Sequence, residues 1–410
     1  MYKEKLKTTG VLIWFACAFF YALEYFIRSS SGALSDSYSA MPYNMTDQQI
    51  SLSSSAFYLT YVLAQLPSGM LVDKFGIKRI MVTSSLIFSL AIFIASITTS
   101  TNGLILYRAL AGLGGGFAFL CAMKSIALWL PDRYFPIFTG FTQFFLYLGA
   151  ALSAAPLVIT VNYISVSMIM SGVFLVCVAL FLFSLFVIKI HPNFESKQAT
   201  KKRKVSAFQN LLKVMQNKQT WLHGFYCFTI YGTTVLFADL WGIRYLSLLG
   251  FSKDMAGTCT SMIFIGIAVF SPLWGILATA IDSERKPLIV DPLLGVFIVV
   301  ALLYINVNPY IALVLCVLFG GVQAVHVLNY SSLRKSVSPA RIATALALVN
   351  LFLPLSGGVL QPMTGAIIGS TKSLTHTEAL HAYQPAMLFI PILMLLSFII
   401  ALFIKDSKDY

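Results

Sequence analysis

Long apolar runs constrain the fold of this 410-residue sequence more than any other feature. Runs of about 18 to 25 residues recur along the chain, and at about 1.5 Å per residue each can cross a hydrocarbon layer of roughly 30 Å. Only 10% of the residues are charged, whereas soluble domains carry about 25%. Because backbone polar groups in lipid must bond within their own segment, these runs predict helices. We expect an all-α membrane protein with spans near 10–32, 50–72, 79–99, 102–128, 136–158, 163–190, 219–247, 254–280, 287–306, 308–333, 341–369 and 383–404.

The distribution of basic residues predicts how these twelve helices are oriented. If they all cross, both termini lie on one side, and that side receives 22 of the 28 Lys and Arg residues. The opposite side receives Lys253 and Lys372, and four more lie within spans. An excess of Lys and Arg in loops marks the cytoplasmic face, so we expect both termini in the cytoplasm. The net charge of +13 is thus a topology signal and not a nucleic-acid surface, which would need interleaved aromatic and polar side chains.

The single long polar segment inside the chain predicts two halves. Residues 191–218 include four consecutive basic residues, Lys201–Lys204, and separate six spans from six. We interpret them as a solvated linker along the anionic inner leaflet. The expected domains are residues 1–190 and 219–410, each a six-helix bundle, joined by this linker. The first span has no small-residue cleavage site behind it, so we interpret it as a retained helix.

Several classes of function are not supported by any motif. The six cysteines fall inside spans without CxxC or metal-ligand spacing, so we expect no metal and no cofactor. No phosphate-binding Walker loop is present, which argues against ATP-driven pumping. No clustered nucleophile and base suggests an enzyme. A transport-fold sensor would normally add soluble domains, and the sequence shows none.

The turn after the second span carries the most specific motif. Gly69 to Arg79 reads GMLVDKFGIKR and resembles the signature loop of the major facilitator superfamily, GxLxD[RK]xGx[RK][RK], at every fixed position. The resemblance implies two bundles that alternate between inward-open and outward-open states. It also implies a cytoplasmic gate that closes in the outward-facing state, made by Gly69, Asp73, Lys74, Gly76, Lys78 and Arg79. The second half keeps Gly275 and its basic end but has Thr279 where the acid belongs.

Other segments narrow this resemblance. The stretches EYFIR, WLPDRYFP and LVNLFLPLSGGVLQP are similar to bacterial carriers grouped loosely with nitrate porters and lysosomal dipeptide carriers. The dipeptide carriers place an acid in the fourth span and an arginine in the fifth, where this chain has Gly116 or Phe117 and Tyr147. The fifth span has Gly140 and Gly149 at the spacing of the family's antiporter motif but lacks its terminal Gly-Pro. These departures argue against a dipeptide carrier and give no support for antiport.

Three charged residues predict the central site. Glu24 lies roughly 21 Å from the inner end of the first span and therefore about 9 Å from the outer edge of the hydrocarbon layer. Glu24 and Arg28 are four residues apart and share one helix face. Arg108 lies about 9 Å below the outer edge in the fourth span, so the three can meet at one level if both helices line the cavity. Charged groups inside a membrane are costly, which makes them functional candidates. The alternative is an ion pair that only orients the first helix.

Other polar residues inside the spans are weaker candidates for substrate binding or coupling. Lys124 lies about 160° around the helix from Arg108, so it faces the cavity only if the Gly114–Gly116 run bends the helix, and otherwise reaches the inner headgroups. Asp239 needs a partner on another helix, while Arg244 favours the interface. The remaining candidates are Tyr58, Tyr61, Gln143 and Tyr147 in the first half and Gln323, His326, Asn329, Asn350 and Gln361 in the second.

The balance of charge inside the spans predicts the solute. Four cations (Arg28, Arg108, Lys124 and Arg244) face two anions (Glu24 and Asp239), which suits an amino acid, short peptide or other small anion. We expect a monomeric secondary carrier in a bacterial inner membrane that imports this solute with protons. The alternatives are an exporter or antiporter and, less favoured, a sensor. In the symport hypothesis the solute takes an arginine, and Glu24 then loses its partner and accepts a proton.

Overall fold

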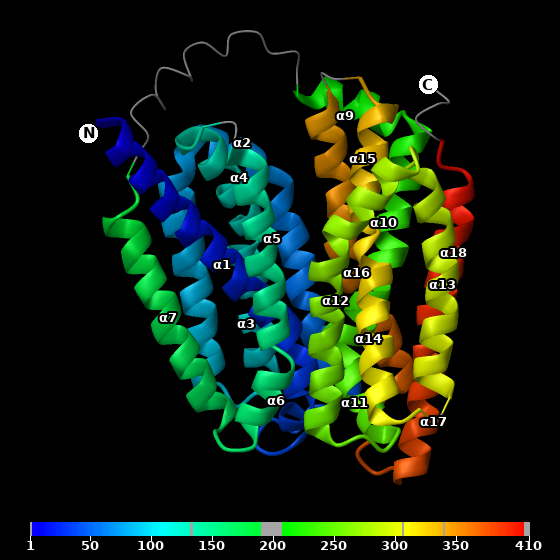
Figure 1. Ribbon diagram of the computed structural model, residues 1–410. Coiled ribbons are helices and arrows are strands. Elements are labelled where there is room, and N and C mark those ends of the chain that lie inside the picture. The colour runs from blue at the N-terminus through cyan, green and yellow to red at the C-terminus, as the bar shows by residue number, and fades with distance from the viewer. Residues whose placement is uncertain (1, 132–133, 190–206, 306, 339–340, 406–410) are drawn as a thin grey trace.

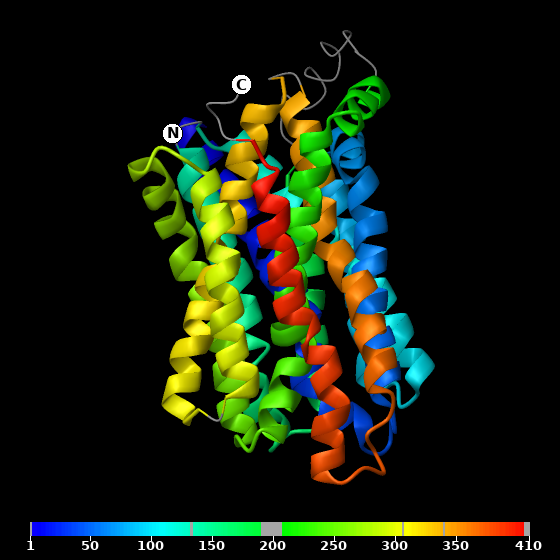
Figure 2. The same ribbon diagram turned by 90° about the vertical axis from the view of Figure 1, so that its right-hand side faces the viewer.

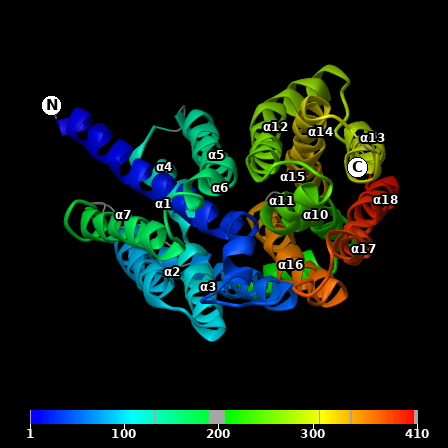
Figure 3. The same cartoon turned by 90° about the horizontal axis from the view of Figure 1, so that it is seen from below.

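The computed structural model describes residues 2–131, 134–189, 207–305, 307–338 and 341–405. Its helices run side by side in two groups, α1–α7 from the first half and α10–α18 from the second (Figure 1). The two groups are also separate when seen along the bundle (Figure 3). The helices of the second half, green to red, extend over the full height of the bundle (Figure 2).

The helices of the first half follow the expected spans closely. They are α1 (Tyr2–Ser39), α2 (Asp47–Ile97), α3 (Thr101–Gly115), α4 (Ala118–Trp129), α5 (Phe135–Leu152), α6 (Ala155–Val161) and α7 (Val166–Phe186). Helix α2 contains two expected spans, and the chain turns between them at Gly76, whose φ of 80° is left-handed. A residue with a side chain rarely adopts such a φ, so glycine fits this turn.

The helices of the second half are more often interrupted. They follow α9 (Ala207–Met215), which lies within the expected linker. They are α10 (Lys218–Leu236), the π-helical turn η2 (Phe237–Trp241), α11 (Gly242–Leu248), α12 (Lys253–Ala280), α13 (Arg285–Tyr304), α14 (Pro309–Ala324), α15 (His326–Ser336), α16 (Ile342–Ile368), α17 (His376–Met387) and α18 (Phe389–Leu402). Within the described residues, ten helical segments are long and apolar enough to cross a membrane, and the 51-residue α2 is one of them.

Besides the seventh expected span, which η2 interrupts, four others contain a helix break, although each of the four is still long and apolar enough to cross a membrane as one segment. The fourth breaks after Gly115, the fifth after Leu152, the tenth after Ala324 and the twelfth after Met387. The break after Gly115 lies within the Gly114–Gly116 run, where a bend was the condition for Lys124 to face the cavity. Apolar periodicity alone does not reveal such breaks, since it continues unchanged across them.

One end of the bundle, which we call the termini end, contains the start of α1 and the end of α18 (Figure 1). At the other end, which we call the far end, six helices begin with a side-chain cap. The capping residues are Thr46, Ser100, Ser165, Ser252, Asn308 and Thr375, each of which accepts a hydrogen bond from a backbone N–H in the first turn. These caps satisfy N–H groups that lack a partner within the helix.

Packing between the halves is tight toward the far end. Helices α2 and α16 cross where Gly357 lies against the Tyr58 ring, and a Cβ at Gly357 would lie 2.5 Å from that ring. Nearer the termini end of α2, a Cβ at Gly69 would meet no heavy atom within 4 Å, and Leu66 and Met70 are exposed. The halves therefore pack closely at the far end and less closely along α2 toward the termini end.

Candidate functional site

The centre of the bundle contains a buried ion pair on α1. Arg28 donates from Nε and Nη2 to Glu24 Oε1, at 2.9 and 2.5 Å. Glu24 is fully buried and Arg28 nearly so. The second carboxylate oxygen, Glu24 Oε2, has no hydrogen-bond partner among the described residues. This oxygen is an unused acceptor, and a proton can bind there without displacing Arg28.

Aromatic rings surround the Arg28 guanidinium. Its central carbon lies 4.4 Å from the ring centroid of Tyr61 and 4.7 Å from that of Tyr25. The rings of Phe57 and Tyr58 follow at 5.7 Å. Ring faces attract a cation without neutralising it, so the guanidinium remains able to bind an anionic group.

Arg108 reaches the same level but binds differently from the expectation. It is fully buried and donates from Nη1 to the carbonyl oxygen of Ile27 at 2.5 Å and from Nη2 to Ser30 Oγ at 3.1 Å. A weaker bond of 3.3 Å reaches the Arg28 carbonyl. Arg108 thus ties α3 to the α1 backbone beside Arg28, and these bonds are to neutral oxygens and not to Glu24.

Asp239 joins the two halves. It lies fully buried on the π-helical turn η2, where Ser29 Oγ donates to its Oδ1 at 2.6 Å and the Tyr58 hydroxyl donates to its Oδ2. Both donors belong to the first half, so the partner that Asp239 needed on another helix comes from α1 and α2. Ser29 follows Arg28 directly in sequence, so both buried carboxylates bond to the same short segment of α1.

A chain of polar and aromatic contacts continues into the second half. The hydroxyls of Tyr25 and Tyr231 are hydrogen-bonded to each other. The His326 ring lies 6.5 Å from Tyr231 and 6.3 Å from Tyr330, and the Tyr330 hydroxyl donates to Asn350 Oδ1 at 2.8 Å. His326 and Asn350 are therefore linked to the central cluster through neighbouring rings.

The other candidates of the second half have structural partners. Gln323 Nε2 donates to Thr233 Oγ1 at 2.6 Å, and Gln361 Nε2 donates to the Val235 carbonyl at 3.2 Å. Asn329 Oδ1 and His223 Nδ1 are 2.6 Å apart. His326 Nδ1 lies 2.7 Å from the Gln323 carbonyl oxygen, so these two residues are in contact across the break after Ala324, whereas the Asn329 side chain bonds to His223.

Two candidates on α5 lie beside the cluster. The Tyr147 ring lies 6.5 Å from that of Tyr25. The Oε1 atom of Gln143 is buried and has no hydrogen-bond partner in the part of the chain that the structure describes. We find no direct contact from either residue to Arg28 in that part.

Lys124, which the sequence placed either in the cavity or at the inner headgroups, contacts the signature loop. Lys124 on α4 forms an ion pair with Asp73, and both belong to the first half. Lys74 lies over the Phe75 ring at 5.0 Å. Lys124 thus belongs with the residues of the signature loop and not with Arg28. The break after Gly115 lies between Arg108 and Lys124, so the two residues belong to different helices.

The excess of cations predicted for the centre is therefore wrong. Lys124 lies against Asp73, and Arg244 forms an ion pair with Asp47 at the far end. The buried centre contains Arg28 and Arg108 together with Glu24 and Asp239, two charges of each sign. The sequence count placed all of these charged groups in one cavity, because it considered only that they lie within spans. In the structure they lie at three different levels of the bundle.

Sequence reasoning missed Tyr25, Ser29 and Tyr231 in this cluster. Tyr25 lies between Glu24 and Arg28 in sequence. A charged pair this deep in a span could have indicated that the neighbouring polar residues belong to the same site. No group of three or more His, Cys, Asp or Glu residues able to hold a metal ion occurs in the described residues.

Comparison with known proteins gives one family. The model of the Major Facilitator Superfamily matches residues 13–249 and 240–409. Two solved structures are similar over almost the whole chain. A D-xylose–proton symporter has a TM-score of 0.75 at 14% identity and covers 98% of this chain and 99% of its own. A bacterial homologue of the human lysosomal transporter Spinster has a TM-score of 0.79 at 16% identity, covering 97% and 98%. At these identities the likeness shows the fold, which confirms the expected fold class.

Sequence relatives match shorter regions. "Probable sulfoacetate transporter SauU" of Cupriavidus necator is 26% identical over 151 residues, which is 37% of this chain and 35% of that protein. "Probable anion transporter 2, chloroplastic" of Oryza sativa subsp. japonica is 28% identical over 125 residues, 30% of this chain and 23% of that protein. "Efflux pump aunC" of Aspergillus niger is 43% identical over 88 residues, 22% and 17%. The matched regions thus span about a third or less of these relatives.

Proposed function

Because this chain belongs to the Major Facilitator Superfamily of membrane transporters, we propose that it is a secondary carrier for a small anionic solute coupled to protons. The chain moves its solute by alternating access between the two halves. Arg28 binds the anionic group, and Glu24 is the proton site.

The observation that carries this proposal is the Glu24–Arg28 pair. The guanidinium is buried among aromatic rings, and its carboxylate partner uses only one oxygen. A carboxylate or sulfonate of the solute can take the guanidinium donors that Glu24 now holds, since arginine binds such planar or tetrahedral anions bidentately. Glu24, once released, is a buried carboxylate without a cation, and accepting a proton removes that cost.

The charge balance of the centre explains why the proton and the solute move together. Two arginines and two carboxylates give no net charge when all four are ionised. Adding one anionic group leaves a buried excess of one negative charge, which is expensive in a low-dielectric interior. Uptake of one proton by Glu24 restores the balance. Proton symport with a monovalent anion therefore keeps the buried centre neutral throughout the cycle.

The relatives named for sulfoacetate and for anions support an anionic solute, more than they support the dipeptides suggested by the looser resemblance. A second candidate function is export, because the efflux pump of Aspergillus niger has 43% identity over 88 residues. We further propose that both termini lie in the cytoplasm, which the distribution of Lys and Arg supports, and that the carrier is a monomer in the cytoplasmic membrane of a bacterium.

The experiment has two stages. A thermal-shift screen of the purified protein against organic sulfonates, carboxylates, amino acids and dipeptides identifies a solute, since a ligand at a hundred times its Kd stabilises the fold by about 2.7 kcal/mol. Reconstituted vesicles are then loaded with that solute. Glu24→Gln retains the shape of the protonated acid, so we expect it to exchange solute across the membrane but to lose accumulation driven by a pH gradient.

The matched control is Glu378→Gln, which removes an exposed carboxylate at the start of α17 and is expected to leave accumulation intact. Accumulation driven by a pH gradient in Glu24→Gln would exclude Glu24 as the proton site and leave Asp239 and His326 as the next candidates. Stabilisation by neutral solutes alone would contradict the proposed anion.

A further inference from the structure

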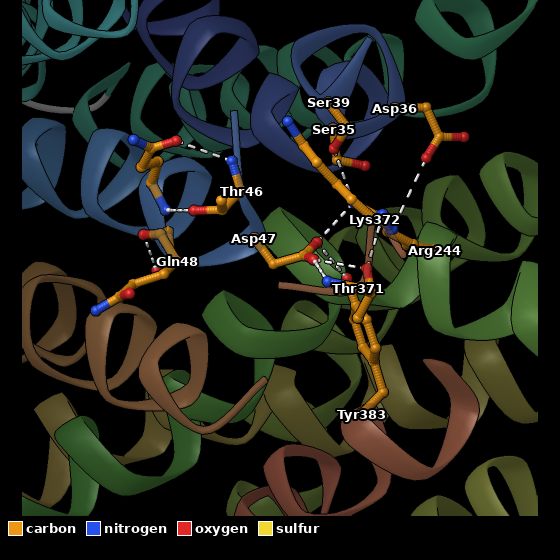
Figure 4. A network of polar contacts seen from close by, with 12 residues as sticks. Ser35, Asp36, Ser39, Thr46, Asp47, Gln48, Arg244, Thr371, Lys372 and Tyr383 are labelled. Carbon is orange, nitrogen blue, oxygen red and sulfur yellow. Dashed lines mark hydrogen bonds and ion pairs between the residues drawn. The ribbon is translucent and has the colours of Figure 1, made fainter. Parts of the chain in front are cut away.

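A second buried carboxylate joins the two halves at the far end. Asp47 opens α2, is 1% exposed, and receives three hydrogen bonds and an ion pair from residues of the second half (Figure 4). Arg244 Nη1 lies 2.6 Å from its Oδ1. The Thr371 backbone N–H and hydroxyl donate to Oδ2 at 3.1 and 2.7 Å, and the Tyr383 hydroxyl donates to Oδ1 at 2.9 Å.

These donors come from three separate places in the second half. Arg244 lies on α11, Thr371 in the connection between α16 and α17, and Tyr383 on α17. One carboxylate of the first half therefore gathers the far ends of several helices of the second. Arg244 also donates to Thr371 Oγ1 at 3.2 Å, which holds the donors together, and to Ser39 Oγ on α1 at 3.1 Å.

Further contacts around Asp47 show the same division of charge. Lys253 forms an ion pair with Asp36 at 2.5 Å, and Lys372 donates to the Asn44 carbonyl at 2.5 Å. Every cation in this group belongs to the second half, and both carboxylates belong to the first. The attraction acts between the halves and not within either one.

Burial separates the strong contact from the weak ones. The side chains of Asp47 and Arg244 are 1% and 17% exposed, whereas those of Asp36 and Lys253 are 44% and 58% exposed. Exposed ion pairs contribute little because water and salt screen them. A buried carboxylate that loses its partners is left with an uncompensated charge, which makes the separation of Asp47 from Arg244 the costly step.

We propose that Asp47, Arg244, Thr371 and Tyr383 form the lock of a far-end gate, and that this lock determines how often the protein opens on that side. Opening requires Asp47 to leave all four donors together. The lock lies apart from the central cluster and needs no solute to act. Its test is therefore independent of the proposed transport function.

The test measures opening by thiol labelling in membrane vesicles of both orientations, without solute. The reporter is Ser55→Cys, because Ser55 is buried where α2 meets α16 and donates to the Gly358 carbonyl at 2.9 Å. A membrane-impermeant maleimide applied to the far-end side reaches this thiol only when the halves separate there. All six native cysteines are buried, and the same protein without the reporter gives the background.

In Asp47→Asn the charge is lost while the shape is kept. We expect labelling to rise about tenfold or more, the change in an equilibrium that about 1.4 kcal/mol produces. Tyr383→Phe removes one of the four donors and should give a smaller rise, which keeps the proposal testable if Asp47→Asn does not fold. The control is Asp254→Asn, since Asp254 also contacts the other half, through Asn162 at 3.4 Å, but is exposed.

Selective increases in Asp47→Asn and Tyr383→Phe support the lock. Unchanged labelling in folded Asp47→Asn overturns it. An equal increase in Asp254→Asn also overturns it, because any loss of far-end charge would then loosen the halves.

Discussion

The far end and the termini end of the bundle use ion pairs in different ways. At the far end, Asp47 and Arg244 pair across the two halves. At the termini end, Asp73 pairs with Lys124 inside the first half, and Glu284 pairs with Lys335 inside the second at 2.6 Å. The first arrangement resists separation of the halves, whereas the other two stabilise each half by itself. Charge therefore closes the far end in this conformation, and the termini-end ion pairs are compatible with open halves.

The helix packing shows the same contrast. Near the far end a Cβ at Gly365 would lie 1.8 Å from Ser51 Oγ, so only glycine lets α16 approach α2 there. Gly69, in the signature loop, has open space around the same position. A conformation closed at the termini end would bring a helix against Gly69, and the glycine leaves room for it.

The largest expected effect tests which end faces the outside. Ser373→Cys lies in an exposed turn at the far end, and Gln216→Cys lies exposed at the termini end after α9. With both termini in the cytoplasm, an impermeant maleimide applied to intact cells should label Ser373→Cys fully and Gln216→Cys not at all. Positions near 200 would give the same test of the 191–218 linker, but 190–206 lie outside the described residues.

Opening the cells supplies the control for this experiment, because both thiols should then react. Labelling of Gln216→Cys in intact cells would reverse the assignment of the two ends. The far-end lock would then face the cytoplasm, and the termini-end ion pairs would face the outside.

The second prediction concerns the termini-end pair in the first half. Asp73→Asn should slow net transport about tenfold, roughly 1.4 kcal/mol, and leave solute affinity almost unchanged, because the signature loop lies away from Arg28. Counterflow and binding measured on the same variant separate the two effects.

Lys124→Gln sharpens this prediction. If Lys124 acts through Asp73, the double variant should be no slower than either single variant. Additive losses would show that Lys124 has a separate role, as in the alternative where it reaches the headgroups. Transport at the parental rate in Asp73→Asn would mean that the loop determines topology alone.

The sequence predicted the membrane class, the helix positions and the signature loop, because each depends on local pattern. Apolar length determines spans, and Gly76 determines a turn. The sequence also placed Glu24, Arg28 and Arg108 at one level, since depth follows from the rise per residue. The sequence did not predict the hydrogen-bond acceptors of Arg108, because these depend on how α1 packs beside α3.

The far-end residues show a different limit. Asp47 reads in sequence as an acid in the first turn of a capped helix, where a favourable interaction with the helix end explains it. Its partners Arg244 and Thr371 are separated from it by almost 200 residues or more in sequence. Only the packing of the two halves brings them together, and no local pattern carries that information. The same holds for Asp239 with Ser29 and Tyr58.

The smallest expected effect comes from the termini-end pair of the second half. Lys335 and Glu284 are 45% and 17% exposed, and Glu284 follows the segment where Thr279 replaces the acid of the signature loop. An ion pair open to solvent typically contributes 0 to about 1 kcal/mol. Glu284→Gln should therefore change the transport rate by about twofold or less, measured beside Asp73→Asn in the same vesicles. Lys335→Gln is the matched variant, and the pair predicts equal small effects for both. A loss in Glu284→Gln as large as that in Asp73→Asn would give each half its own termini-end gate residue. The asymmetry inferred from Thr279 would then fail, because Glu284 would be supplying the missing acid from five residues further along the chain.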